Sequence, residues 1–108
     1  MTPPLFVVLV TAPDANVARE LAGAVLKARL AACVNIVSGL ESHYWWEGKI
    51  DQSAEVLLLI KTTKPKLKAL QKLVLEKHPY DTPEFVAIPA SMVSEKYMAW
   101  VRDSVKPA

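Results

Sequence analysis

The stretch YWWEGKIDQSAEVLLLIKT, residues 44–62, decides the fold of this chain. The Glu-Gly pair at 47–48 predicts a tight turn, because glycine adopts the positive φ that a short hairpin turn requires. We expect residues 49–62 to pair antiparallel with an extended segment that starts at Cys33, and the Ser-Gly pair at 38–39 predicts a bulge within that segment. The centre of the fold is therefore a long β-hairpin.

Strands and helices alternate on either side of this hairpin. The apolar run at 5–10 predicts a buried first strand, and Asp14 is the expected cap of a helix that ends near Ala28. A second helix is expected to open at 63–65 and to stop before Pro79. A fourth strand at 84–88 and a last helix capped by Ser94 complete the chain. The order βαββαβ plus a C-terminal helix predicts an α+β ferredoxin-like sandwich, with two helices on one face of an antiparallel sheet.

Length and composition limit the class of protein. With 108 residues, 52% of them hydrophobic and 22% charged, the chain is expected to form one domain over 1–108. Its longest apolar runs are far shorter than the roughly 20 residues of a membrane helix, so no membrane partner is expected. A net charge of +2 is too small for a dedicated nucleic-acid binder. The single cysteine and the lack of a basic N-terminal region favour a cytoplasmic location.

The apolar runs also predict self-association. Residues 5–10 and 56–60 are apolar on both faces of their strands, whereas two helices cover only one face of the sheet. The other face would expose a large hydrophobic patch. We therefore expect a homo-oligomer with sheets packed together, in which at least one of Trp45 and Trp46, on opposite faces of the hairpin, contacts the core or a neighbouring subunit.

Six motifs in this order resemble those of the CutA divalent-cation tolerance proteins. They are TAP (11–13), LAACVN (30–35), YWWEGKI (44–50), EVLLLIKT (55–62), HPYDTPE (78–84) and YMAW (97–100). The resemblance covers about residues 5 to 104 and implies a ferredoxin-like protomer in a cytoplasmic homotrimer, linked to tolerance of copper and other divalent metals. It implies no established enzymatic activity. The number three comes only from this resemblance.

The resemblance also implies where copper binds in some bacterial members. Their cysteine and two adjacent histidines correspond here to Val10, Lys77 and His78, so only the last of the three ligand types is present. His78 is nevertheless the first candidate for a metal ligand, either with copies of itself around a threefold axis or with Asp81 or Glu84. The alternative is that its ring satisfies carbonyls at a helix end. Cys33 is a weaker candidate and is expected to be a small buried side chain.

A second candidate site is a cleft formed by the loop 78–84. If Lys61 and Tyr80 face the same crevice, with Asp81 and Glu84 nearby, the expected ligand is a small anion or a metal chelate. The alternative is a rigid loop whose polar residues satisfy local backbone donors.

Three functional interpretations remain open. The leading one is a homotrimer that binds Cu²⁺ or another divalent cation without catalysis and without an organic cofactor, because no nucleophile, phosphate-loop or metal-hydrolase motif is present. The second is a trimeric sensor resembling PII proteins, which binds an anionic metabolite or nucleotide in clefts between subunits. The third is a structural scaffold.

Overall fold

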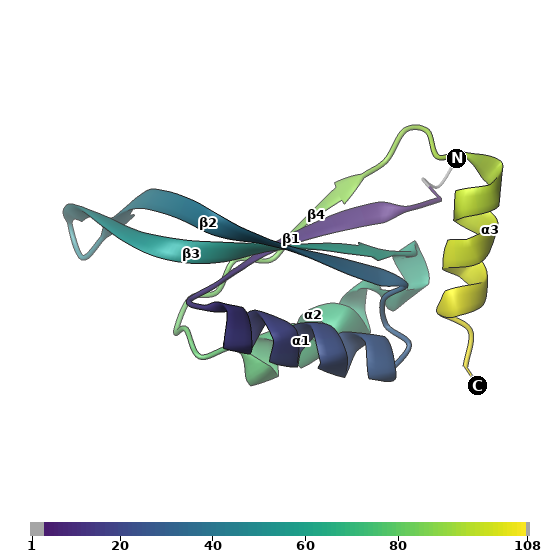
Figure 1. The fold of residues 1–108 in the computed structure, drawn as a ribbon, viewed down its shortest axis with the longest axis horizontal. Helices are drawn as coiled ribbons and strands as arrows, with labels where there is room; N and C mark the ends of the chain where they lie inside the picture. The colour runs from purple at the N-terminus through teal and green to yellow at the C-terminus, as the bar shows by residue number, and fades with distance from the viewer. Residues whose placement is uncertain (1–3, 108) are drawn as a thin grey trace.

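The structure, a computed structural model, describes residues 4–107 (Figure 1). Its strands are β1 (Phe6–Ala12), β2 (Cys33–Trp46), β3 (Lys49–Thr62) and β4 (Val86–Pro89). Its α-helices are α1 (Ala15–Lys27), α2 (Leu67–Lys77) and α3 (Glu95–Ser104), and a 3₁₀ turn at Lys64–Lys66 precedes α2. The predicted α+β class, with a four-stranded antiparallel sheet and three helices, is confirmed.

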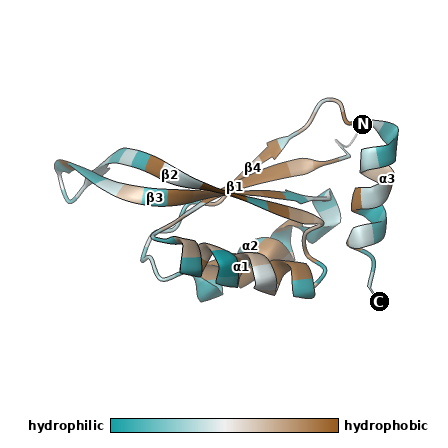
Figure 2. Cartoon of the chain, viewed as in Figure 1, coloured by the Kyte–Doolittle hydropathy of each residue, from teal (hydrophilic) through white to brown (hydrophobic). Residues whose placement is uncertain are grey.

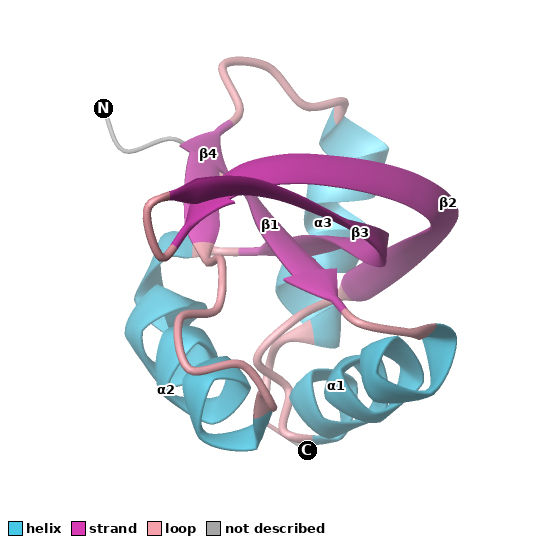
Figure 3. Cartoon of the chain, turned by 90° about the vertical axis from the view of Figure 1, so that its left-hand side faces the viewer, coloured by secondary structure: helices cyan, strands magenta, loops and turns pink. Residues whose placement is uncertain are grey.

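The strands form one sheet in the order β2-β3-β1-β4, with every neighbouring pair antiparallel. The hairpin of β2 and β3 is confirmed, and its turn residues Glu47 and Gly48 have φ of 50° and 77°. The predicted bulge is confirmed by a register shift between Val37 and Leu40, next to Gly39 at φ 83°. Figure 3 shows α1 and α2 beside each other on one side of the sheet.

The start of β4 and the cap of α3 differ from the sequence prediction. β4 begins at Val86 instead of residue 84, because the ladder with β1 starts at the Val86–Leu9 pair and Glu84 turns into the cleft described below. Ser94 does precede α3, but its side chain makes no cap hydrogen bond; its carbonyl accepts from the Met98 N–H instead.

The core lies between the sheet and the first two helices. It contains alternate residues of β1 and β3 together with the inward faces of α1 and α2, and its largest members are Val8, Val10, Leu21, Val25, Leu58, Ile60, Leu70 and Val74. Thr62 is fully buried at its edge, where Oγ1 donates to the Leu30 carbonyl at 2.7 Å. On this side of the sheet, every second side chain of β1 and β3 points toward the helices, because side chains alternate between the two faces of a strand.

The opposite side of the sheet, which we name the open face, is apolar and faces away from α1 and α2. Cross-strand pairing places on it Val7, Leu9, Val37, Leu57, Leu59, Val86 and Ile88. Helix α3 packs against one end through Met98 and Val101, leaving most of this face half-buried or exposed. Figure 2 shows hydrophobic colouring along β1, β4 and the centre of β3. The predicted two-sided apolar pattern is confirmed; what covers the open face stays a prediction.

The outer part of the β2–β3 hairpin, which we name the hairpin arm, projects from the body of the protein (Figure 1). With the arm included, the principal extents are 44 × 27 × 23 Å. Near the tip of the arm, Trp45 and Ile50 pair across the strands and are 73% and 69% exposed. Trp46 is 46% exposed, so neither tryptophan is buried within the protomer. In the described range 4–107, no helix has the length and apolar character needed to cross a membrane.

Candidate functional site

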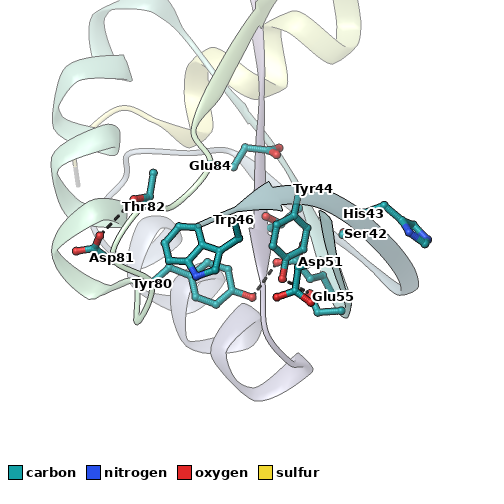
Figure 4. A pocket seen from close by; sticks show the side chains of 12 residues that line it. Ser42, His43, Tyr44, Trp46, Asp51, Glu55, Tyr80, Asp81, Thr82 and Glu84 are labelled. Carbon is teal, nitrogen blue, oxygen red and sulfur yellow. Dashed lines mark hydrogen bonds between the residues drawn. The ribbon is translucent and has the colours of Figure 1, made fainter. Parts of the chain in front are cut away.

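A cleft opens where the hairpin arm meets the loop between α2 and β4. Its volume is about 720 Å³. It is lined by Thr11, Ser42, His43, Tyr44, Trp46, Asp51, Ser53, Glu55, Tyr80, Asp81, Thr82 and Glu84 (Figure 4). No lysine or arginine is among these residues, so the cleft is acidic although the whole chain carries a net charge of +2.

The hairpin supplies one wall through its alternating side chains. Asp51, Ser53 and Glu55 are two residues apart on β3 and therefore point to one side of the strand. Tyr44 lies opposite Asp51 on β2, and its hydroxyl is 3.1 Å from Ser53 Oγ. Their side is also that of the open face, because Glu55 precedes Leu57 by two residues. The cleft is thus the polar continuation of an apolar surface.

His78 fixes the opposite wall in place. Its imidazole is 7% exposed; Nε2–H donates to the Thr11 carbonyl at 2.7 Å, and Nδ1 accepts the Tyr80 N–H at 3.1 Å. Because Nδ1 must accept, the ring is the neutral Nε2–H tautomer. The rings of His78 and Tyr80 lie 4.7 Å apart between centroids. One side chain therefore joins the end of β1 to the loop that carries Tyr80.

This arrangement bears directly on the predicted metal ligand. Both ring nitrogens of His78 are already hydrogen-bonded to the backbone, so a metal would have to replace one of these bonds. The alternative raised from the sequence, a ring that satisfies backbone groups, describes this geometry better, although the carbonyl lies at the end of β1 and not at the end of α2. Here the ring acts as a positioning group for the loop.

Tyr80 and Glu55 close the base of the cleft. The Tyr80 hydroxyl donates to Glu55 Oε2 at 2.8 Å (Figure 4). Burial raises the pKa of the Tyr80 hydroxyl, and the hydrogen bond to Glu55 and its charge raise it further. Burial and the Glu55 charge also raise the pKa of the Glu84 carboxyl. The cleft therefore disfavours additional negative charge and favours a positive ligand.

Two candidate residues lie elsewhere. The Nζ of Lys61 donates to Asn35 Oδ1 six residues along β3 from Glu55, and Lys61 does not line the cleft. Cys33 pairs with Lys61 across the strands, is half-buried instead of buried, and has Sγ 3.7 Å from the same Asn35 oxygen. The structure thus brings together Tyr80, Asp81 and Glu84 but does not bring Lys61 or Cys33 to them.

Asp51, Glu55 and Tyr44 of the hairpin were not anticipated from the sequence. The period-two spacing of Asp51, Ser53 and Glu55 is a signal for a shared face, but it does not indicate that the loop 78–84 folds against that face. Trp46, expected at a subunit interface, lines the cleft.

A ready-made metal site is not found in the described part of the chain. Among residues 4–107, no three His, Cys, Asp or Glu side chains are grouped closely enough to hold an ion. His43 and Glu41 form an exposed pair at 2.7 Å on the hairpin, without a third partner of this kind. The carboxylates that line the cleft are thus distributed over its walls and do not form a single cluster.

Comparisons with known proteins identify close relatives. A sequence model of the family described as CutA1 divalent ion tolerance protein matches residues 6–104. "Divalent-cation tolerance protein CutA" of Thermus thermophilus is 46% identical over 98 residues, covering 91% of this chain and 95% of that protein. "Protein CutA 1, chloroplastic" of Oryza sativa subsp. japonica is 47% identical over 105 residues, covering 97% of this chain and 59% of that protein. The chain thus spans little more than half the length of this plant relative.

The fold is shared with solved structures. The crystal structure of CutA1 from Oryza sativa superposes with a TM-score of 0.93 at 46% identity, covering 99% of this chain and 98% of that one. The divalent cation tolerance protein from Thermus thermophilus superposes with a TM-score of 0.90 at 45% identity, covering 93% and 97%.

Replacing His78 is expected to loosen the cleft wall. His78→Ala leaves the Thr11 carbonyl and the Tyr80 N–H without their partner, which lowers the free energy of unfolding by about 2 kcal/mol or more. Urea denaturation at fixed protein concentration measures this. His43→Ala, at an exposed position, is the control and changes stability by no more than about 0.5 kcal/mol. Equal effects of the two substitutions would contradict the positioning role.

Glu84→Gln tests the electrostatics of the cleft. Because the folded-state pKa of Glu84 is raised, the fold favours the protonated carboxyl and loses that advantage as pH rises through this pKa. The variant is therefore expected to be more stable than the wild type at pH 7, by less than about 1 kcal/mol because solvent screens an exposed carboxylate. The difference disappears below the ordinary glutamate pKa. A variant less stable than the wild type at pH 7, with Glu20→Gln as the control, would refute this.

Proposed function

Because the chain belongs to the CutA1 divalent ion tolerance protein family, we propose that it protects against excess divalent cations by binding them reversibly, without catalysis. The relative from Thermus thermophilus is named a divalent-cation tolerance protein, and we assign the same role to this chain. The observation that supports binding is the cleft, whose walls carry four carboxylates and no lysine or arginine.

The donor set favours weak, exchangeable binding. Carboxylate and hydroxyl oxygens are suitable ligands for divalent cations, but they are not gathered as a closed three-ligand site in residues 4–107. Among first-row divalent ions, copper binds a given oxygen or nitrogen site most tightly. Copper is therefore the strongest ligand we expect, although Val10 and Lys77 stand where the family resemblance places two other ligands.

We place this function in a homotrimer. An apolar sheet face of this extent is unfavourable in water, and packing it against other copies removes it from solvent. The cleft continues the open face, so a neighbouring subunit would lie close to the carboxylates. The number three rests on the family resemblance.

An anion-binding sensor is less well supported. An anionic metabolite would meet four carboxylates in this cleft, and the cation expected to hold it, Lys61, is bonded to Asn35 elsewhere.

The cytoplasmic location stays a prediction.

A Cu²⁺ titration by calorimetry tests the binding. We expect saturable binding that weakens about tenfold or more in Glu55→Gln, which removes one charge at the base of the cleft. Glu20→Gln on the outer side of α1 is the matched carboxylate control. Absence of binding, or binding that Glu55→Gln leaves unchanged, would refute cation binding at this cleft.

The assembly is tested by light scattering at micromolar concentration. We expect a particle of three times the 11.9 kDa chain mass. Leu59→Lys, at the centre of the open face, should dissociate it, because burying an unpaired charge there costs several kcal/mol per subunit. Leu75→Lys, on the outer side of α2, is the control and should leave the mass unchanged. A wild-type monomer would refute the assembly.

A further inference from the structure

The cleft is much larger than a bare metal ion requires. Its volume of about 720 Å³ falls within the roughly 300–1,000 Å³ typical of small-molecule sites. One wall is the hairpin and the other is the loop that His78 holds in place. A cleft of this volume between two walls can hold an organic ligand of several heavy atoms.

The distribution of charge indicates what kind of ligand it is. Asp51 and Glu55 stand on the hairpin wall, and Asp81 and Glu84 on the loop wall. None of the four takes part in an ion pair within residues 4–107. They are also not gathered for a single ion in that range. Charges divided between two walls match a ligand that carries two positive groups separated by a spacer.

Aromatic rings supply what such a spacer needs. Tyr44, Trp46 and Tyr80 line the same cleft, and Figure 4 shows them around Glu55. Ring faces attract ammonium groups and pack against methylene chains. A hydrated metal ion has no methylene chain to pack against them, whereas an alkylammonium benefits from both rings and carboxylates. Tyr80 uses one oxygen of Glu55, and a carboxylate has the capacity to accept further donors.

We propose that the cleft binds linear aliphatic diamines and polyamines, that is, organic cations with two or more ammonium groups joined by short alkyl chains. One ammonium pairs with Glu55 and Asp51, a second pairs with Glu84, and the alkyl chain lies against Trp46 and Tyr80. The inference rests on the proposed function in that it assumes a cation-binding cleft, and it names a second class of cation for that cleft.

Calorimetric titration of the full chain in metal-free, low-salt buffer tests this. The probes are 1,4-diaminobutane and spermidine, compared with 1-aminobutane, which has the same chain and one charge, and Mg²⁺, which has two charges and no chain. We expect one saturable site per chain for the diamine, with an affinity about tenfold or more above both comparison ligands. Diamine binding no tighter than that of Mg²⁺ or 1-aminobutane would overturn the proposal.

Variants separate specific binding from general charge attraction. Trp46→Ala should weaken diamine binding about tenfold. Trp100→Ala, at a similarly exposed tryptophan on α3, should leave it unchanged. Asp51→Asn, at an exposed position, is a second variant that keeps the test decisive if Trp46→Ala does not fold. Diamine affinity unaffected by substitution at both Trp46 and Asp51 would also overturn the proposal.

The Cu²⁺ titration distinguishes the two possible failures. Copper binding that depends on Glu55, with no preferential diamine binding, overturns this inference and leaves the proposed function standing. Diamine binding that depends on Trp46, without copper binding, supports an organic-cation site and refutes the metal role.

Discussion

The antiparallel pairing of β3 with both β2 and β1 is the interaction on which the rest of this structure depends. Because side chains alternate along a strand, β3 presents Val56, Leu58 and Ile60 to the helices and Leu57 and Leu59 to the open face. A shift of one residue would exchange these two sets and bury Glu55 and Lys61 in the core. The same register that builds the core therefore also sets the open face and the hairpin wall of the cleft.

His78 provides the second constraint, because it connects parts of the chain that are distant in sequence. Its ring links the Thr11 carbonyl at the end of β1 to the Tyr80 N–H, and Tyr80 in turn reaches Glu55 on β3. Such a network is most effective when each member is satisfied, and in the described residues no buried side-chain polar atom lacks a hydrogen-bond partner. A histidine with the ring chemistry of a metal ligand is used here to hold a loop.

The cleft is the part of the structure on which the proposed cation binding depends. Acidic and aromatic groups occupy one region of a chain whose net charge is positive, so the overall charge gives no indication of the ligand. Carboxylates spread over two walls suit exchangeable binding better than tight capture. Because they lie beside the open face, the proposed assembly and the proposed ligand binding are expected to influence each other.

The sequence by itself determined the elements and their pairing. The apolar runs at 5–10 and 56–60, the Glu-Gly turn, the Ser-Gly bulge and the prolines specified the hairpin, the helices and the two-sided apolar sheet, because these signals act between near neighbours. Only the tertiary structure decided the site. It placed Tyr80, Asp81 and Glu84 against Asp51 and Glu55, committed His78 to the backbone, and left Lys61 at the other end of β3. The physical reason is that these contacts join residues 25 or more positions apart, whose distance depends on how the loop after α2 packs and not on any local pattern.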